Sequence, residues 1–100
     1  MSTKKHPLAG NVVLVRDNRA GIHVGTLESA SGTACVLTDA RKVWYWVGAA
    51  SCHGIAAHGV KSGSKVCPTV ARVESFDAVE IVSMTDEAAK CVLGFTEWTP

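Results

Sequence analysis

The chain is 100 residues long, carries a formal net charge of +1 at pH 7, and is 47% hydrophobic but only 19% charged. This length predicts a single domain, and the lack of any run of about 18 apolar residues excludes a transmembrane helix, so no membrane partner is expected. Lysine and arginine occur singly or in pairs. Duplex binding needs them clustered on one face, which argues against nucleic acid as a partner. The surplus of apolar residues instead predicts a homo-oligomer.

The N-terminal segment, residues 1–9, is polar and contains Pro7. It lacks the apolar core of a secretory signal, which predicts a cytoplasmic protein, and it is expected to form a flexible arm. Residues 10–100 are then a single α+β domain.

Valine-rich patterning predicts a first strand at Asn11–Arg16, followed by the turn-forming run Asp17–Gly21 and a second strand at Ile22–Glu28. Together these segments are typical of a β-hairpin. Gly25 inside the second strand indicates a bulge or a close approach by another backbone. A third strand is expected at Thr33–Thr38.

The stretch Asp39–Ser51 contains half of all the aromatic residues in the chain, namely Trp44, Tyr45 and Trp46. Its first two residues, Asp39 and Ala40, are expected to form a short connection into a fourth strand. Because side chains alternate along a strand, this strand would place Trp44 and Trp46 on the same face.

The second half of the chain is predicted to contain two short helices. The first spans Ala49–His58 with Ser51 or Gly48 near its start, and the second is capped by Thr85 and ends near Leu93. A loop, two strands and a docked tail are expected, in chain order, at Lys61–Lys65, Pro68–Glu74, Phe76–Met84 and Phe95–Trp98. The predicted fold class is α+β: a small twisted antiparallel sheet or partial barrel of five to six strands with two short helices.

The aromatic stretch also predicts a binding site. The indoles of Trp44 and Trp46 would form a stacking surface beside the Arg41 guanidinium and a helix N-terminus, which suits a nucleotide-like small molecule. One indole would stack on a base while Arg41 pairs with a phosphate. The other candidate ligand-binding groups are the backbone N–H groups of Ala49, Ala50 and Ser51, the Ser51 hydroxyl, and the side chains of Arg16 and His23. The alternative is that both indoles are core or oligomer-interface residues.

The chemistry-bearing residues show no catalytic or metal-binding spacing. The four cysteines form no Cys-x-x-Cys pair, so free thiols are expected. The set Cys52, His53, His58 and Cys67 matches no familiar zinc pattern, and neither a metal nor a cofactor is predicted. No spacing of aspartate, histidine and serine indicates a triad, which favours a binding protein over an enzyme.

Two stretches, Gly21–Ser29 and Arg41–Ser51, resemble a family of small tailed-phage proteins of unknown function, and the likeness extends from Val13 to Trp98. It implies a phage protein that acts in the cytoplasm of a bacterial host. By type, the chain is also similar to small phage proteins that sequester nucleotide immune signals, such as cyclic ADP-ribose-like or cyclic oligonucleotide molecules.

This resemblance implies a homo-oligomer that captures such a signal without catalysis and so counters bacterial defence. Two alternatives stay open: an interaction or structural accessory protein of a phage, and a small hydrolase of the same signals.

Overall fold

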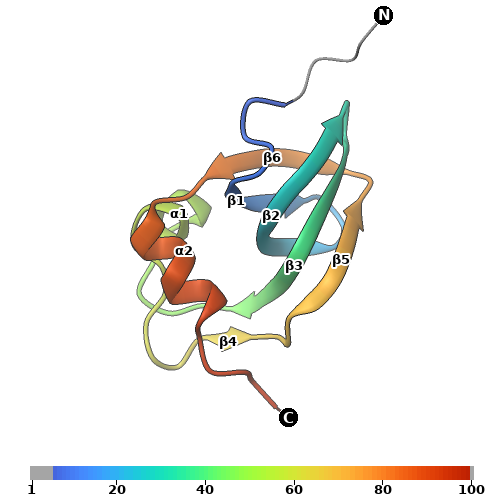
Figure 1. The fold of residues 1–100 in the computed structure, drawn as a ribbon. Helices are drawn as coiled ribbons and strands as arrows, with labels where there is room; N and C mark the ends of the chain where they lie inside the picture. Colours follow the sequence, from blue (N-terminus) through green and yellow to red (C-terminus); the bar gives the residue numbers. More distant parts are fainter. Residues whose placement is uncertain (1–5, 100) are drawn as a thin grey trace, which may run out of the picture.

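The computed structural model of the protein describes residues 6–99. Six strands and two short helices follow one another along the chain (Figure 1): β1 (Val12–Asp17), β2 (Gly21–Ser31), β3 (Ala34–Tyr45), α1 (Cys52–His58), β4 (Lys65–Val66), β5 (Val70–Ser75), β6 (Ala78–Ser83) and α2 (Asp86–Leu93). All strand pairs are antiparallel, in the order β4-β3-β2-β1-β6, and β5 joins β3 beside β4. The predicted α+β class, with a small antiparallel sheet and two short helices, is confirmed.

The long strand β3 bends at a bulge, where Asp39 and Ala40 stand opposite the single residue Gly25 of β2. Asp39 has a φ of 48°, and a Cβ on Gly25 would lie 2.8 Å from the Ala40 Cβ. The prediction of a bulge or close backbone approach at Gly25 is therefore confirmed. The predicted connection at Asp39–Ala40 is wrong, because the chain continues through the bulge as one strand.

Side chains that alternate between the two faces of the sheet pack into two apolar clusters. The helix-side cluster packs β1, β2 and β3 against α1 and α2, and its buried members are Leu14, Ile22, Val24, Val43, Ile55, Val60, Val66 and Val92. The second cluster lies on the other face of these strands and contains Val13, Val15, Leu27, Cys35, Leu37 and Ala40, with side chains of β5 and β6 packed against it. Both faces of the central strands are thus buried, which fixes their register.

The two helices lie side by side at one edge of the molecule (Figure 1). In α1, Ser51 is the N-cap and its Oγ accepts a hydrogen bond from the Gly54 N–H, so the helix begins three residues later than Ala49. In α2, the Thr85 hydroxyl accepts from the Ala88 N–H, which confirms the predicted cap. Neither helix within residues 6–99 is long and apolar enough to cross a membrane.

The ends of the described chain pack on the body. Of the expected arm, residues 1–5 lie outside the described residues, while residues 6–9 enter a turn and Leu8 packs against the second cluster. At the other end, the Trp98 N–H donates to the Val66 carbonyl at 2.9 Å, and Glu97 forms a parallel bridge with Val66. The predicted docking of the tail is confirmed.

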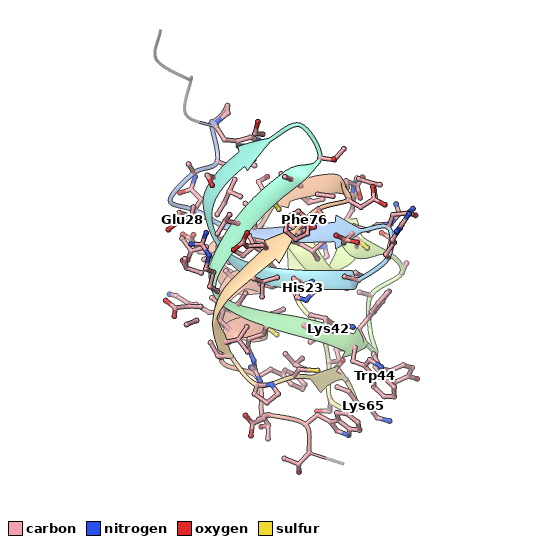
Figure 2. The ribbon with its side chains drawn as sticks, turned by 90° about the vertical axis from the view of Figure 1, so that its right-hand side faces the viewer. His23, Glu28, Lys42, Trp44, Lys65 and Phe76 are labelled. Atoms are coloured by element: carbon pink, nitrogen blue, oxygen red, sulfur yellow. The ribbon has the colours of Figure 1, made fainter. Side chains whose placement is uncertain are left out.

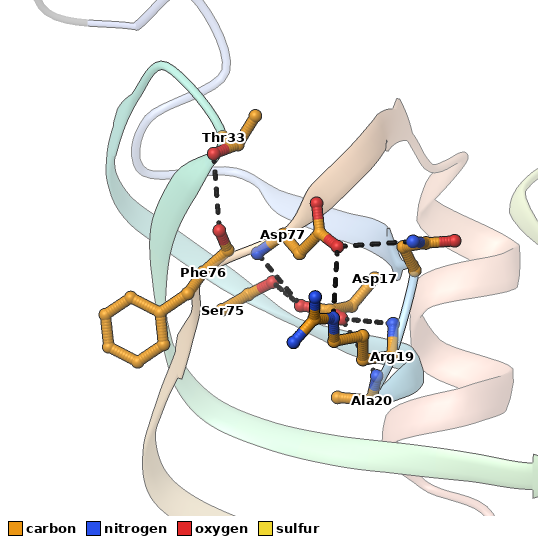
Figure 3. A network of polar contacts seen from close by, with 8 residues as sticks. Asp17, Arg19, Ala20, Thr33, Ser75, Phe76 and Asp77 are labelled. Carbon is orange, nitrogen blue, oxygen red and sulfur yellow. Dashed lines mark hydrogen bonds and ion pairs between the residues drawn. The ribbon is translucent and has the colours of Figure 1, made fainter.

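A buried carboxylate joins two turns of the sheet (Figure 3). Asp17 Oδ1 accepts from the N–H groups of Arg19 and Ala20, each at 2.8 Å, within the β1–β2 turn. Its Oδ2 accepts from the Ser75 hydroxyl at 2.5 Å and from the Asp77 N–H at 3.3 Å, in the β5–β6 turn. These four hydrogen bonds, led by the one from Ser75, hold the pKa of Asp17 far below its ordinary value.

Candidate functional site

A second bulge in β3 turns two aromatic side chains outward. Val43 pairs with Val66 and Tyr45 pairs with Lys65, so Trp44 is the extra residue of β3 opposite β4. Val43 is buried in the helix-side cluster, whereas Trp44 and Tyr45 are 53% and 52% exposed. A bulge breaks the alternation of side chains, and here it brings two consecutive aromatics to the surface.

The exposed Trp44 indole stacks on Trp98 of the docked tail. The two ring centroids are 4.9 Å apart and the ring planes are inclined by 12°. The Lys65 ammonium lies 4.9 Å from the Trp44 centroid, 5.3 Å from the Trp98 centroid and 5.7 Å from the Tyr45 centroid. These distances are within the range of a cation–π interaction, so the lysine and the indoles form one surface.

Further basic side chains continue this surface along the sheet. Lys42 lies two residues before Trp44 in β3 and pairs in register with His23 of β2. His23, Lys42, Trp44 and Lys65 follow one another down one side of the molecule (Figure 2). Among residues 6–99, neither Lys42 nor Lys65 forms an ion pair with a carboxylate. We call Lys42, Trp44, Tyr45, Lys65 and Trp98 the aromatic–lysine surface.

His23 borders this surface but is half-buried. Its Nδ1 is buried and has no hydrogen-bond partner within residues 6–99. Burial lowers the pKa of His23, the nearby Lys42 charge lowers it further, and the Asp17 charge opposes both effects. The imidazole is therefore kept neutral more firmly than an exposed histidine would be.

Arg41 does not lie on the aromatic–lysine surface. It is 3% exposed, and its guanidinium donates to backbone carbonyls, with Nε bound to Cys67 O at 2.8 Å and Nη1 bound to Phe95 O at 2.6 Å. Further contacts reach Val92 O, Leu93 O and Val66 O. These contacts hold α2 and the tail to the sheet, so the structure does not present Arg41 on an exposed surface beside the indole of Trp44, where the sequence pattern predicts it.

Trp46 and Trp44 do not form a shared stacking face. Trp46 follows the end of β3, packs against the helix-side cluster and donates from Nε1 to the Ala49 carbonyl at 3.2 Å. The Ser51 hydroxyl caps its own helix, which has only seven residues. The predicted anion cradle at Ala49, Ala50 and Ser51 is thus not adjacent to an exposed pair of indoles.

Arg16 and His23 lie on opposite faces of the sheet. Arg16 pairs with Ile22, which belongs to the helix-side cluster, whereas His23 pairs with Val15 of the second cluster. Arg16 is exposed beside α1, where its charge acts on the Cys52 thiol, although burial dominates there and raises the pKa of Cys52. Of the predicted site residues, Trp44 and His23 remain together and Arg16 does not join them.

The structure adds Lys42, Lys65 and Trp98, which were not predicted as site residues. Sequence spacing gives no signal for the Trp44–Trp98 contact, because α1, β4, β5, β6 and α2 all lie between the two residues in the chain. For Lys65, the sequence signal is its place at the end of the basic loop predicted at Lys61–Lys65.

The remaining groups of chemical interest are the cysteines, the possible metal ligands and the cavities of the protein. The four cysteines are free thiols, and no three His, Cys, Asp or Glu side chains in the described part of the chain gather as metal ligands. Two cavities, of about 600 and 370 Å³, lie beside α2 and beside Phe76 respectively. Trp44 lines neither of them.

The fold and the site define a small α+β protein that presents an aromatic–lysine surface at one edge of a bent antiparallel sheet. The model of the family described as a domain of unknown function (DUF6948) matches residues 10–92. The chain belongs to this family. The match includes Trp44 and Lys65 and ends before Trp98. No curated protein and no solved structure matches the chain.

Proposed function

We propose that this protein captures a nucleotide-derived ligand without altering it chemically, and that a planar ring of the ligand stacks on Trp44. One observation carries the proposal: an indole that is 53% exposed lies with its centroid 4.9 Å from the ammonium group of Lys65. Stacking of a base on an aromatic side chain contributes about 1–3 kcal/mol. A lysine beside the stack adds a point charge for a phosphate.

Three residues of the surface, and His23 beside it, have a role in this proposal. Trp44 stacks on the base, and Lys65 pairs with the nearest phosphate. Lys42 lies two residues along β3, about 7 Å at the rise of an extended strand, and would pair with a second phosphate. His23 forms the rim beside Lys42 as a neutral imidazole. A ligand with one ring and two phosphates therefore suits the surface better than a single nucleoside.

The proposed ligand is a nucleotide immune signal, either cyclic ADP-ribose-like or a cyclic oligonucleotide, and the proposed setting is a phage protein in the bacterial cytoplasm. The resemblance to small tailed-phage proteins supports this setting. Capture is favoured over turnover because rings and ammonium groups bind and orient a ligand, whereas hydrolysis needs a base aligned with a nucleophile. A homo-oligomer would raise the number of binding sites per particle.

A specific observation favours one other function, that of a protein-interaction accessory. Phe76, in the β5–β6 turn, is 73% exposed. It lines the 370 Å³ cavity together with Cys35 and Val36. An exposed aromatic beside an apolar hollow is typical of a protein contact surface.

Calorimetric titration of the purified protein with a panel of cyclic nucleotides and ADP-ribose derivatives tests the proposal. We expect heat of binding and a change in tryptophan fluorescence for at least one compound. That compound should be recovered unchanged after the protein is denatured. A new product in the recovered material would point to hydrolysis. A panel without any binding, together with a stoichiometric protein captured from infected cells through Phe76, would favour the accessory function.

A further inference from the structure

The tail after α2 is attached in two parts of unequal strength. Phe95 packs against the helix-side cluster, and its carbonyl accepts the 2.6 Å hydrogen bond from Arg41. Beyond this anchor, the described residues Thr96, Glu97 and Thr99 are exposed. Residues 96–99 contact the body through the bridge at Val66, with its 2.9 Å hydrogen bond from the Trp98 N–H, and through the indole of Trp98.

The Trp98 ring covers one face of the Trp44 indole, and a base that stacked on that face would need the same space. The Trp98 centroid lies 4.9 Å from that of Trp44, and both rings are within 5.3 Å of the Lys65 ammonium. A ligand that stacks on this face of Trp44 and pairs its phosphate with Lys65 must occupy the same volume. The tail indole and the ligand base are therefore mutually exclusive on this face.

We propose that residues 96–99 form a displaceable strap whose Trp98 indole occupies the ligand position in the free protein. This inference rests on the proposed function of the aromatic–lysine surface. A ligand with a ring and a phosphate replaces the indole stack with a base stack and adds an ion pair to Lys65, which the neutral indole does not supply. A flat apolar molecule without an anionic group gains only the stack, so the strap excludes it.

The strap has a quantitative consequence for affinity. The protein can bind the ligand only when Trp98 has left Trp44. When this open state is only a fraction of the population, the apparent Kd is the intrinsic Kd divided by that fraction. Removing the strap makes every molecule competent. It should therefore tighten binding, whereas removing part of a genuine stacking platform would weaken it. The sign of the change separates the two roles of Trp98.

The first experiment needs no ligand. Hydrogen–deuterium exchange is measured for the Trp98 N–H and for the Cys67 N–H, which donates to the Lys42 carbonyl at 2.8 Å in the adjacent part of the sheet. We expect the Trp98 amide to exchange on the order of 100-fold faster, because a strap opens locally without unfolding the domain. Equal protection of the two amides would overturn the strap.

The second experiment measures binding of ADP-ribose, which carries one base and two phosphates, to the wild type, to Trp98→Ala and to the tail control Thr99→Ala. We expect Trp98→Ala to bind roughly tenfold more tightly, equivalent to about 1.4 kcal/mol, and Thr99→Ala to match the wild type. Unchanged or weaker binding by Trp98→Ala would overturn the strap. If none of the three proteins binds ADP-ribose but the Trp98 amide exchanges fast, the exchange result supports local opening of the tail. The absence of binding then counts against the proposed ligand.

Discussion

The Ser75 hydroxyl donates a 2.5 Å hydrogen bond to the Asp17 carboxylate across a sequence separation of 58 residues. This contact joins the β1–β2 turn to the β5–β6 turn (Figure 3). Both side chains are buried, and a buried carboxylate is tolerated only where its oxygens are fully hydrogen-bonded. The pair is therefore a structural contact that holds the two turns together.

Replacing Asp17 with asparagine should destabilise the protein. The new amide group has only one acceptor oxygen. Its NH₂ group would face N–H or O–H groups that now donate hydrogen bonds to the carboxylate. We expect a loss in the free energy of unfolding on the order of 3 kcal/mol, measured by urea denaturation. Asp77→Asn is the control, because within residues 6–99 the Asp77 side chain makes only exposed contacts, to Asn18 and Arg19. An equal effect of the two substitutions would contradict this account.

The same carboxylate predicts part of the acid denaturation profile. Because hydrogen bonding lowers the pKa of Asp17 in the folded protein, its contribution is fully present above the unfolded value of about 3.9 and is lost as the pH falls below it. The slope of stability against pH between pH 5 and 2 should be flatter in Asp17→Asn than in the wild type. Parallel slopes would show that Asp17 is not the responsible group.

His23 predicts a second pH effect in a different window. The folded protein resists protonation of His23, whereas the unfolded chain takes up the proton near pH 6.5. Acidification through that value therefore favours unfolding, and stability should decline from about pH 7.5 to 5.5. In His23→Gln this decline should be smaller, while the exposed control His58→Gln should retain it. Thermal melting across this range measures the difference, and identical declines in all three proteins would refute the prediction.

The close approach at the first bulge predicts a pair of substitutions. In Gly25→Ala, the new Cβ would lie 2.8 Å from the Ala40 Cβ and 2.9 Å from its Cα. We expect a loss of about 1–3 kcal/mol from this overpacking, part of which Ala40→Gly should restore in the double variant. The helical Gly54, where a Cβ would meet its nearest atom at 3.4 Å, is the contrasting position. Gly54→Ala should be neutral or stabilising by up to about 1 kcal/mol, and additive effects of Gly25→Ala and Ala40→Gly would contradict the close contact.

Arg41 predicts a coupled loss of stability and of tail docking. Arg41→Met keeps the apolar stem but leaves the carbonyls of Cys67 and Phe95 without their donor. We expect a loss of about 3–5 kcal/mol, because each buried carbonyl left without a donor costs about 1–3 kcal/mol, and faster hydrogen exchange at the Trp98 N–H. Arg41→Lys should recover only part of the loss, because a point charge cannot serve carbonyls on two sides. A variant as stable as the wild type would show that Arg41 is not the anchor.

The sequence allowed correct prediction of features that depend on nearby residues. The first hairpin, the bulge signal at Gly25, and the Thr85 cap each depend on turn, glycine or capping chemistry within a few positions. The two-helix α+β class follows from these local signals. The docking of the tail was also correct, since its apolar residues need cover.

The errors concern places where β3 departs from regular geometry. The sequence pattern at Asp39 indicates a connection, whereas in the structure this residue has a positive φ and marks a bulge within one strand. The second bulge then turns Tyr45 outward and Trp46 toward the core, because an extra residue reverses the faces of the side chains that follow it. Arg41 looked exposed by adjacency to Trp44, although its carbonyl partners come from β4, α2 and the tail. The Trp44–Trp98 stack depends on long-range packing that no local pattern encodes.

The most direct test of the central claim is the affinity of the ligand-binding panel for Trp44→Ala. Trp44 is exposed, so its truncation should leave folding intact while removing the stacking ring. The account predicts that the best-binding cyclic nucleotide or ADP-ribose derivative loses about tenfold or more in affinity, whereas the remote exposed control Phe76→Ala binds like the wild type. Equal affinity of Trp44→Ala and the wild type would contradict a binding site on the aromatic–lysine surface.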